Sequence, residues 1–171
     1  MEPIFENVRV DTEQLVQRAF CILMGKKYLI QFILSGICFL LAIGLYVLRR
    51  EGVLLCAAVV YAFFLGRRIY QYTTYGKRAL KKRLAYYDNM NPPMTNHFFE
   101  DRMVSQDIDS VDITPYNKIS KVEFYSDLIM LYRKDGRVTV LDPYGFTKGD
   151  AQSFVWFIQS KTTPVNLIQE R

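Results

Sequence analysis

The sequence is poor in the side chains that form covalent cross-links and metal sites. Its 171 residues include only three cysteines and one histidine. Cys21, Cys38 and Cys56 form no Cys-x-x-Cys pair, and His97 has no second ligand at the spacing of a zinc site. Three thiols also exclude a disulfide-based scaffold. We therefore expect no metal ion and no cofactor, and interpret the cysteines as small apolar residues.

Catalytic motifs are missing as well. The sequence contains no Gly-x-Gly-x-x-Gly, P-loop, Gly-x-Ser-x-Gly or His-Glu-x-x-His pattern. Asp107, Asp109 and Asp112 are spaced like the start of a calcium loop, but the glycine and the terminal glutamate of such a loop are absent. The sequence nominates no catalytic or cofactor-binding residue, and it predicts a protein that is not an enzyme.

One long segment lacks charge altogether. The 21 residues from Tyr28 to Leu48 are uncharged, which is enough for a helix to cross the roughly 30 Å apolar core of a bilayer. A second apolar run, Gly52 to Leu65, continues to about Tyr70; we expect a second span, with a re-entrant segment as the alternative. A chain of this size cannot bury the first helix in a soluble core. The sequence therefore predicts a transmembrane helical hairpin over residues 28–70.

Acidic residues are scarce in the first half of the chain. Up to Tyr87 there are 13 basic and 5 acidic residues, and after it 9 and 12. Lysine and arginine are more numerous at the outer ends of the hairpin than in its loop, which holds Arg49 and Arg50. By the positive-inside rule, both termini face the cytoplasm and the protein is a multi-pass protein of the inner (cytoplasmic) membrane.

Small residues recur along both apolar segments. Ala58, Ala62 and Gly66 are four residues apart on the second segment, and Gly36 and Gly44 share a face of the first. Such faces let helices approach closely where no hydrophobic effect drives their association. We expect contact within the hairpin, with homodimerisation as the alternative.

A basic juxtamembrane connector, residues 71–93, follows the hairpin. A cytoplasmic leaflet is negatively charged and attracts nearby lysine and arginine. The candidates for contact with anionic lipid are Lys77, Arg78, Lys81, Lys82 and Arg83. The alternative is an ordinary positive flank that only sets topology. Nucleic acid is not an expected partner, because the region beyond the connector is acidic.

Residues 94–163 have the pattern of a small α+β domain. Asp135-Gly136 is a strong hairpin-turn signal between two apolar runs. A helix over about 148–161 is predicted, with Thr147 as its N-cap and Asp150 as its third residue. The strand-like runs before it are 97–104, 110–113, 118–125, 128–133 and 137–141. Four or five antiparallel strands form a curled sheet covered by this helix, and residues 164–171 form a tail.

The segment ahead of the hairpin, residues 1–27, combines a strand and an amphipathic helix. Pro3 to Val10 alternates like a strand, and Asp11-Thr12-Glu13 begins a helical run that ends at Met24. With both termini on one side, we expect this first strand to add to the edge of the C-terminal sheet.

The order of these elements resembles that of the bacterial YcxB-like family. The residues that carry the resemblance are Phe98-Phe99-Glu100-Asp101, the segment 116–122, Leu128 to Tyr132, Val140-Leu141-Asp142, Phe146 to Asp150, and Phe154. Similar sequences usually carry Trp where this one has Tyr116. The resemblance implies a PH-like domain, which is a bent antiparallel sheet closed by a C-terminal helix. It implies no catalytic motif and no established function.

The leading functional hypothesis is a non-enzymatic bacterial membrane protein that presents its PH-like domain at the cytoplasmic surface for binding or scaffolding. One alternative is a small accessory subunit of a larger membrane complex, and a second is a sensor of anionic lipid. The expected partners are membrane lipids, with a protein partner or a second copy of the chain as further candidates.

Overall fold

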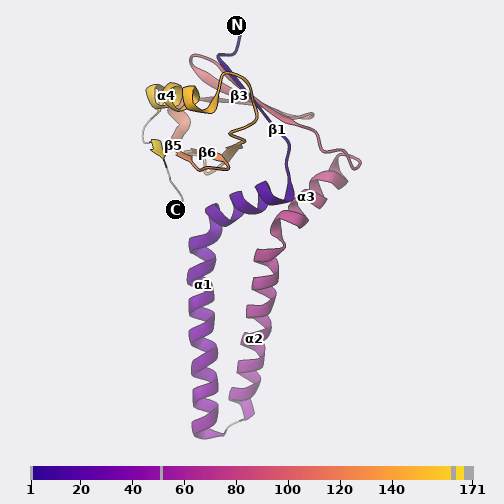
Figure 1. The fold of residues 1–171 in the computed structure, drawn as a ribbon. Helices are drawn as coiled ribbons and strands as arrows, with labels where there is room; N and C mark the ends of the chain where they lie inside the picture. The colour runs from indigo at the N-terminus through magenta and orange to yellow at the C-terminus, as the bar shows by residue number, and fades with distance from the viewer. Residues whose placement is uncertain (1, 51, 163–164, 168–171) are drawn as a thin grey trace. The chain divides into compact units, whose positions relative to one another are not determined.

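The chain divides into two compact units in the computed structural model (Figure 1). Thr12–Lys82 forms one, here termed the helical unit; Met1–Asp11 and Arg83–Arg171 form the other, the sheet unit. The structure describes residues 2–50, 52–162 and 165–167. The sequence of the helical unit contains 11 basic and 2 acidic residues, and that of the sheet unit 11 and 15. The two units therefore carry opposite net charge.

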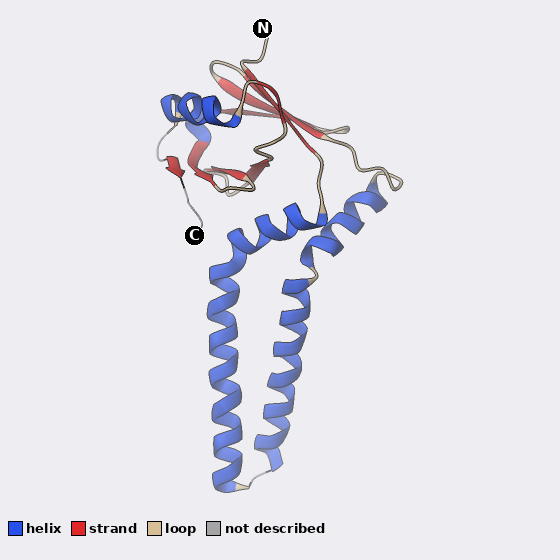
Figure 2. Cartoon of the chain, in the orientation of Figure 1, coloured by secondary structure: helices blue, strands red, loops and turns tan. Residues whose placement is uncertain are grey.

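Two long helices and the start of a third make up the helical unit (Figure 2). Helix α1 covers Glu13–Arg49, α2 covers Gly52–Thr73, and α3 covers Tyr75–Tyr86. Thr12 caps α1, its Oγ1 accepting from the Leu15 N–H at 3.2 Å, and the chain leaves α1 through Arg50 in the left-handed conformation. The expected end of the first helix at Met24 is wrong, because no proline or cap interrupts the 37 residues of α1.

Helices α1 and α2 run side by side as a hairpin (Figure 2). Ala42 and Ala58 are buried. The one polar amide of the first apolar segment, Gln31, accepts a hydrogen bond from Arg68 across the pair. Both helices are long and apolar enough to cross a membrane.

The sheet unit contains nine described strands, one short 3-10 helix at Tyr116–Lys118 and one α-helix, α4, at Ala151–Lys161. The strands are β1 Phe5–Arg9, β2 Met94–Phe98, β3 Arg102–Gln106, β4 Val111–Pro115, β5 Ile119–Phe124, β6 Ile129–Arg133, β7 Val138–Leu141, β8 Phe146–Lys148 and β9 Val165–Leu167. Of the predicted tail, residues 165–167 form β9, and the rest lies outside the described residues.

These strands form two sheets rather than the single curled sheet expected. The first has the order β4-β3-β2-β1-β8 and the second the order β7-β6-β5-β9. All described neighbours are antiparallel except β5 and β9. The run 97–104, expected as one strand, turns at the exposed Glu100 and Asp101 and becomes β2 and β3. The unit is α+β, as predicted, and Gly136 occupies the predicted turn with φ of 83°.

Strand β1 lies inside the first sheet and not at its edge. It pairs with β2 from Phe5↔Phe98 to Arg9↔Met94, and with β8 on its other side. Its buried residues are Phe5, Asn7 and Arg9. The edge position expected from the sequence is therefore wrong: β8, which the sequence analysis assigned to a helix cap, covers the outer side of β1.

Helix α4 packs its apolar side on the core. Phe154 and Ile158 are fully buried with residues of both sheets, whereas Trp156 on the opposite side is 71% exposed. The predicted cap is shifted by three residues: Asp150 is the N-cap, accepting from the Ser153 N–H at 2.8 Å, and Thr147 belongs to β8. Gly149, at φ of 78°, reverses the chain between strand and helix, so the helix cannot begin at Thr147.

Candidate functional site

A cavity of about 310 Å³ lies where the three helices of the helical unit meet. We call it the three-helix cavity. Tyr28 of α1 and Gln71 of α2 line it together with four residues of α3, which are Tyr75, Arg78, Ala79 and Lys82. These four are spaced i, i+3, i+4 and i+7, so they share one face of α3.

Hydrogen bonds from α1 fix the junction between α2 and α3. The Gln17 amide donates to the Tyr72 carbonyl at 2.8 Å and accepts from the Gly76 N–H at 2.7 Å. It thereby satisfies backbone groups left unpaired where one helix ends and the next begins. Gly76 also allows close approach, since a Cβ there would lie 2.5 Å from the Glu13 carbonyl oxygen. Gly76 therefore lets α3 pack closely against α1.

Aromatic rings hold the wall of the three-helix cavity in place. Phe20 stacks on Tyr75 with centroids 3.8 Å apart, and Tyr28 lies 5.3 Å from Tyr72. These contacts join all three helices. The cavity is therefore bounded by rings that contact one another across the three helices.

Positive charge faces the cavity from α3. Arg78 and Lys82 are one turn apart, and Arg78 is oriented by donating to the Gln71 carbonyl at 2.9 Å and by lying over the Tyr70 ring at 5.6 Å. None of the six lining residues is acidic. The arrangement is suited to an anion that accepts hydrogen bonds.

The structure separates the five basic residues proposed for lipid contact. Arg78 and Lys82 line the cavity; Lys77 and Lys81 are exposed and do not line it. Arg83 belongs to the sheet unit, where its guanidinium lies 3.3 Å from Asp11 and 3.2 Å from Asp107 and donates to the Pro92 carbonyl. Its charge is used inside the protein, so its proposed role in lipid contact is withdrawn.

The small residues of the hairpin do not form one packing face between α1 and α2. Ala58 is buried in the hairpin, whereas Ala62 and Gly66 are exposed. A Cβ added at Gly36, Gly44 or Gly66 would meet no atom within 4 Å. Close packing of the two helices therefore relies on Ala42 and Ala58 and not on these glycines.

Sequence reasoning missed the neutral part of the cavity. Tyr28, Gln71, Tyr75 and Ala79 have no charge and match no motif. The i, i+3, i+4, i+7 spacing on α3 was available as a signal. The spacing alone did not predict the break between α2 and α3 at Thr74, which brings that face of α3 to the same cavity as Tyr28.

A second set of buried charges lies in the sheet unit. Arg9 on β1 donates to the Val140 carbonyl on β7, and its Nε lies 2.9 Å from Asp11. Burial lowers the pKa of Arg9, and the neighbouring Asp11 opposes that shift. Arg9, Asp11, Arg83 and Asp107 thus form an internal network that ties β1 to the second sheet, to the last turn of α3 and to the residue after β3.

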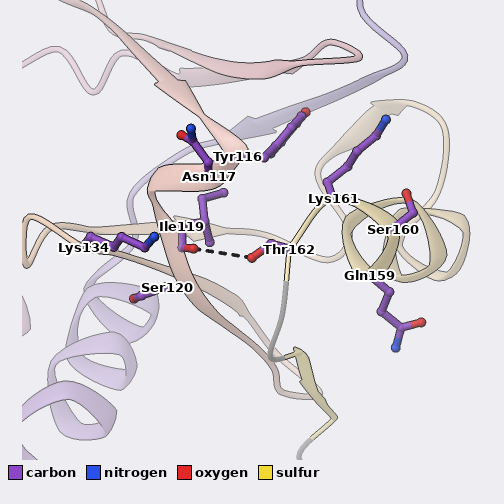
Figure 3. A pocket seen from close by; sticks show the side chains of 9 residues that line it. All are labelled: Tyr116, Asn117, Ile119, Ser120, Lys134, Gln159, Ser160, Lys161 and Thr162. Carbon is purple, nitrogen blue, oxygen red and sulfur yellow. Dashed lines mark hydrogen bonds between the residues drawn. The ribbon is translucent and has the colours of Figure 1, made fainter.

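Two further hollows lie in the sheet unit. One of about 470 Å³ lies between the start of β5 and the end of α4 (Figure 3). The side chains of Gln159, Ser160 and Lys161 point in different directions there, and Lys161 pairs with Glu100. The other, of about 420 Å³, contains Arg133, whose charge pairs with Asp112 and Asp135.

His97 and the acidic residues show no metal geometry. His97 Nδ1 lies 3.2 Å from Glu6, and in the part of the chain that the structure describes no three His, Cys, Asp or Glu side chains gather as ligands. Asp107 and Asp112 are instead engaged by Arg83 and Arg133.

Glu123 on β5 is a buried carboxylate of the sheet unit. Tyr132 and Tyr125 donate to its Oε2 at 2.5 and 3.0 Å, and Lys121 pairs with its Oε1. Burial raises the pKa of Glu123, but these three donors together outweigh burial and leave the pKa below its usual value. Burial and the bond to Glu123 raise the pKa of Tyr132.

This geometry predicts an acid-dependent stability. A lowered folded-state pKa stabilises the protein above the unfolded pKa, about 4.3 for Glu, and that stabilisation is lost as pH falls through the folded value. We expect Glu123→Gln to lower the free energy of unfolding at pH 7 by about 1–3 kcal/mol, with the difference from wild type shrinking below about pH 4. Denaturant unfolding at several pH values measures the free energy of unfolding, and Glu2→Gln, at an exposed position, is the control. Parallel pH profiles of this free energy for wild type and Glu123→Gln would contradict the prediction.

Comparison with family models, with curated proteins and with solved structures finds no match to this chain.

Proposed function

We propose that this chain is a bacterial inner-membrane protein whose α1–α2 hairpin crosses the bilayer twice and whose sheet unit is a cytoplasmic, non-enzymatic binding or scaffolding module. The observation that carries the proposal is the exposed apolar surface of the hairpin. In the most apolar part of each helix only 6% of residues are buried. Side chains such as Leu40, Leu48 and Val53 are 68%, 81% and 78% exposed. Surface of this extent needs an apolar environment.

Strand pairing in the sheet unit supports two crossings. Strand β1 precedes the hairpin and β2 follows it, yet the two pair over five residues. A membrane-inserted hairpin whose two flanks pair in one sheet has both flanks on the same side, and this favours an even number of crossings. A full span by α1 with a re-entrant α2 would leave the strands on opposite sides.

Several features support a PH-like, YcxB-like module. Strands β1 to β4 form a meander in one sheet, β5 to β7 form a meander in a second, and α4 follows with its apolar side on the core. In this proposal the hairpin is an insertion between the first and second strands of the module. Arg133 and Lys161, which line its hollows, are paired with carboxylates of the same unit.

Cysteine labelling in intact cells tests the proposal. In a chain whose three native cysteines are replaced by serine, a single cysteine is placed at Arg50 or at the 86% exposed Tyr144. A membrane-impermeant maleimide should label position 50 from outside, and position 144 only after the cells are opened. Labelling of position 144 in intact cells, or labelling of position 50 only after the cells are opened, contradicts the proposed topology.

A further inference from the structure

We infer that the three-helix cavity binds the phosphate of an anionic glycerophospholipid headgroup, an inference that rests on the proposed insertion of α1 and α2 in a membrane. Diffuse attraction of a basic flank to a charged leaflet needs no cavity. The present site is different because specific contacts fix its shape.

The position of the cavity along the helices matches the headgroup layer. Tyr28 is the first residue of the uncharged segment of α1, and Gln71 lies two residues before the end of α2. The uncharged segment of α1 therefore begins at the cavity, and the charged residues Arg67 and Arg68 of α2 lie within about one turn of it. Tyrosine, which has an apolar ring and a polar hydroxyl, is enriched at this depth.

The lining of the cavity suits an organic phosphate. Arg78 carries five N–H donors, of which one is used by the Gln71 carbonyl. Lys82 adds a second cation one turn away, and Tyr28 and Tyr75, which also line the cavity, each carry a hydroxyl that can donate. Ala79, the smallest side chain of this face, leaves the space between them. About 310 Å³ accommodates a glycerophosphate headgroup.

The scaffold around the cavity is set without a ligand. Gln17 bridges Tyr72 and Gly76, and Phe20 stacks on Tyr75. A site whose helices and rings are held in this way has fewer groups to order on binding than a flexible basic surface, which favours affinity.

Native mass spectrometry of the full-length protein in a neutral detergent tests the inference. Phosphatidylglycerol and phosphatidylcholine are added in competition at fixed ionic strength. We expect one phosphatidylglycerol per chain, bound in preference to phosphatidylcholine. The double variant Arg78→Gln/Lys82→Gln should weaken that binding about 10-fold or more relative to the matched variant Lys77→Gln/Lys81→Gln. The matched variant removes the same charge from the same helix outside the cavity.

An equal loss in both variants would overturn the inference, because it would indicate attraction to the whole basic surface. Ala79→Leu gives an independent test, since it fills the cavity without changing charge; it should weaken binding at least as much as the charge variant. Retained binding in Ala79→Leu contradicts the site.

Soluble sn-glycerol 3-phosphate distinguishes the source of the phosphate. We expect no displacement of phosphatidylglycerol at equimolar concentration, because the acyl chains hold the lipid at the site. Full displacement would overturn the lipid assignment in favour of a soluble phosphate. If the cavity does not bind lipid, the cysteine-labelling pattern still has the expected form. If the hairpin does not insert in the membrane, that pattern changes, so the two hypotheses fail in different experiments.

Discussion

Residues 83–171 expressed alone will not fold, and joining residues 1–11 to them through a linker of about five Gly and Ser residues will restore a soluble, cooperatively folded sheet unit. The fragment without β1 loses the strand that joins β2 to β8. It also loses the Phe5 ring from the core and the Asn7 side chain, which donates to the Asp142 carbonyl at 2.7 Å.

A short linker suffices because the ends to be joined are close. The Asp11 carboxylate lies 3.3 Å from the Arg83 guanidinium. We expect dispersed amide resonances and a single unfolding transition for the linked chain, and a collapsed or aggregated state for the fragment. Native-like resonances from the fragment alone would show that β1 is dispensable.

A matched pair of substitutions in the linked chain tests whether the buried Phe5 side chain is the reason that β1 is needed. Phe5→Ser should lower the free energy of unfolding by about 3–5 kcal/mol, because it empties a core site between Phe154 and Phe157. Ile4→Ser, on the neighbouring residue that is 39% exposed, should lower it by only about 1 kcal/mol.

Arg83→Gln in the full-length protein should destabilise the sheet unit by about 3 kcal/mol. The substitution leaves Asp11 and Asp107, whose side chains are 12% and 11% exposed, without their shared cation. It also removes the bond to the Pro92 carbonyl, which holds the entry into β2. Hydrogen exchange at the β2 and β3 amides measures the loss of protection.

The neighbouring residue supplies the control. Lys82→Gln removes the same charge one residue earlier, from an exposed side chain that has no carboxylate partner in the structure's described residues. It should leave β2 and β3 protection unchanged. Adding Asp107→Asn to Arg83→Gln should recover part of the lost protection, because it removes the negative charge that Arg83 no longer pairs with. Equal protection in Arg83→Gln and Lys82→Gln would contradict an internal role for Arg83.

The sequence predicted those features of the fold that are determined by residues close together in the chain. The uncharged run from Tyr28 predicted an apolar helix, and Asp135-Gly136 predicted the β6–β7 turn, where Gly136 supplies the positive φ. The α+β class followed from short apolar runs before a helix. Each signal lies within a few residues of the structure it specifies.

Features set by distant residues were not predictable in the same way. The inner position of β1 depends on Phe146 and Lys148 of β8, some 140 residues later. The use of Arg83 inside the sheet unit depends on Asp11 and Asp107, which no local pattern associates with it. The three-helix cavity depends on Gln17 and Gly76 meeting across a sequence separation of 59 residues.

The inner position of β1 also determines when the first sheet can form during synthesis. Between the end of β1 at Arg9 and the start of β2 at Met94, the ribosome must add residues 10–93. At about 5–20 residues per second, β1 emerges roughly 4–17 s before its first partner strand. Through that interval both of its edges stay unpaired, and Glu6, Asn7 and Arg9 keep the waiting strand polar enough to resist aggregation. A nascent chain stalled before Met94 therefore has no sheet, and the module closes only after the whole hairpin has been translated.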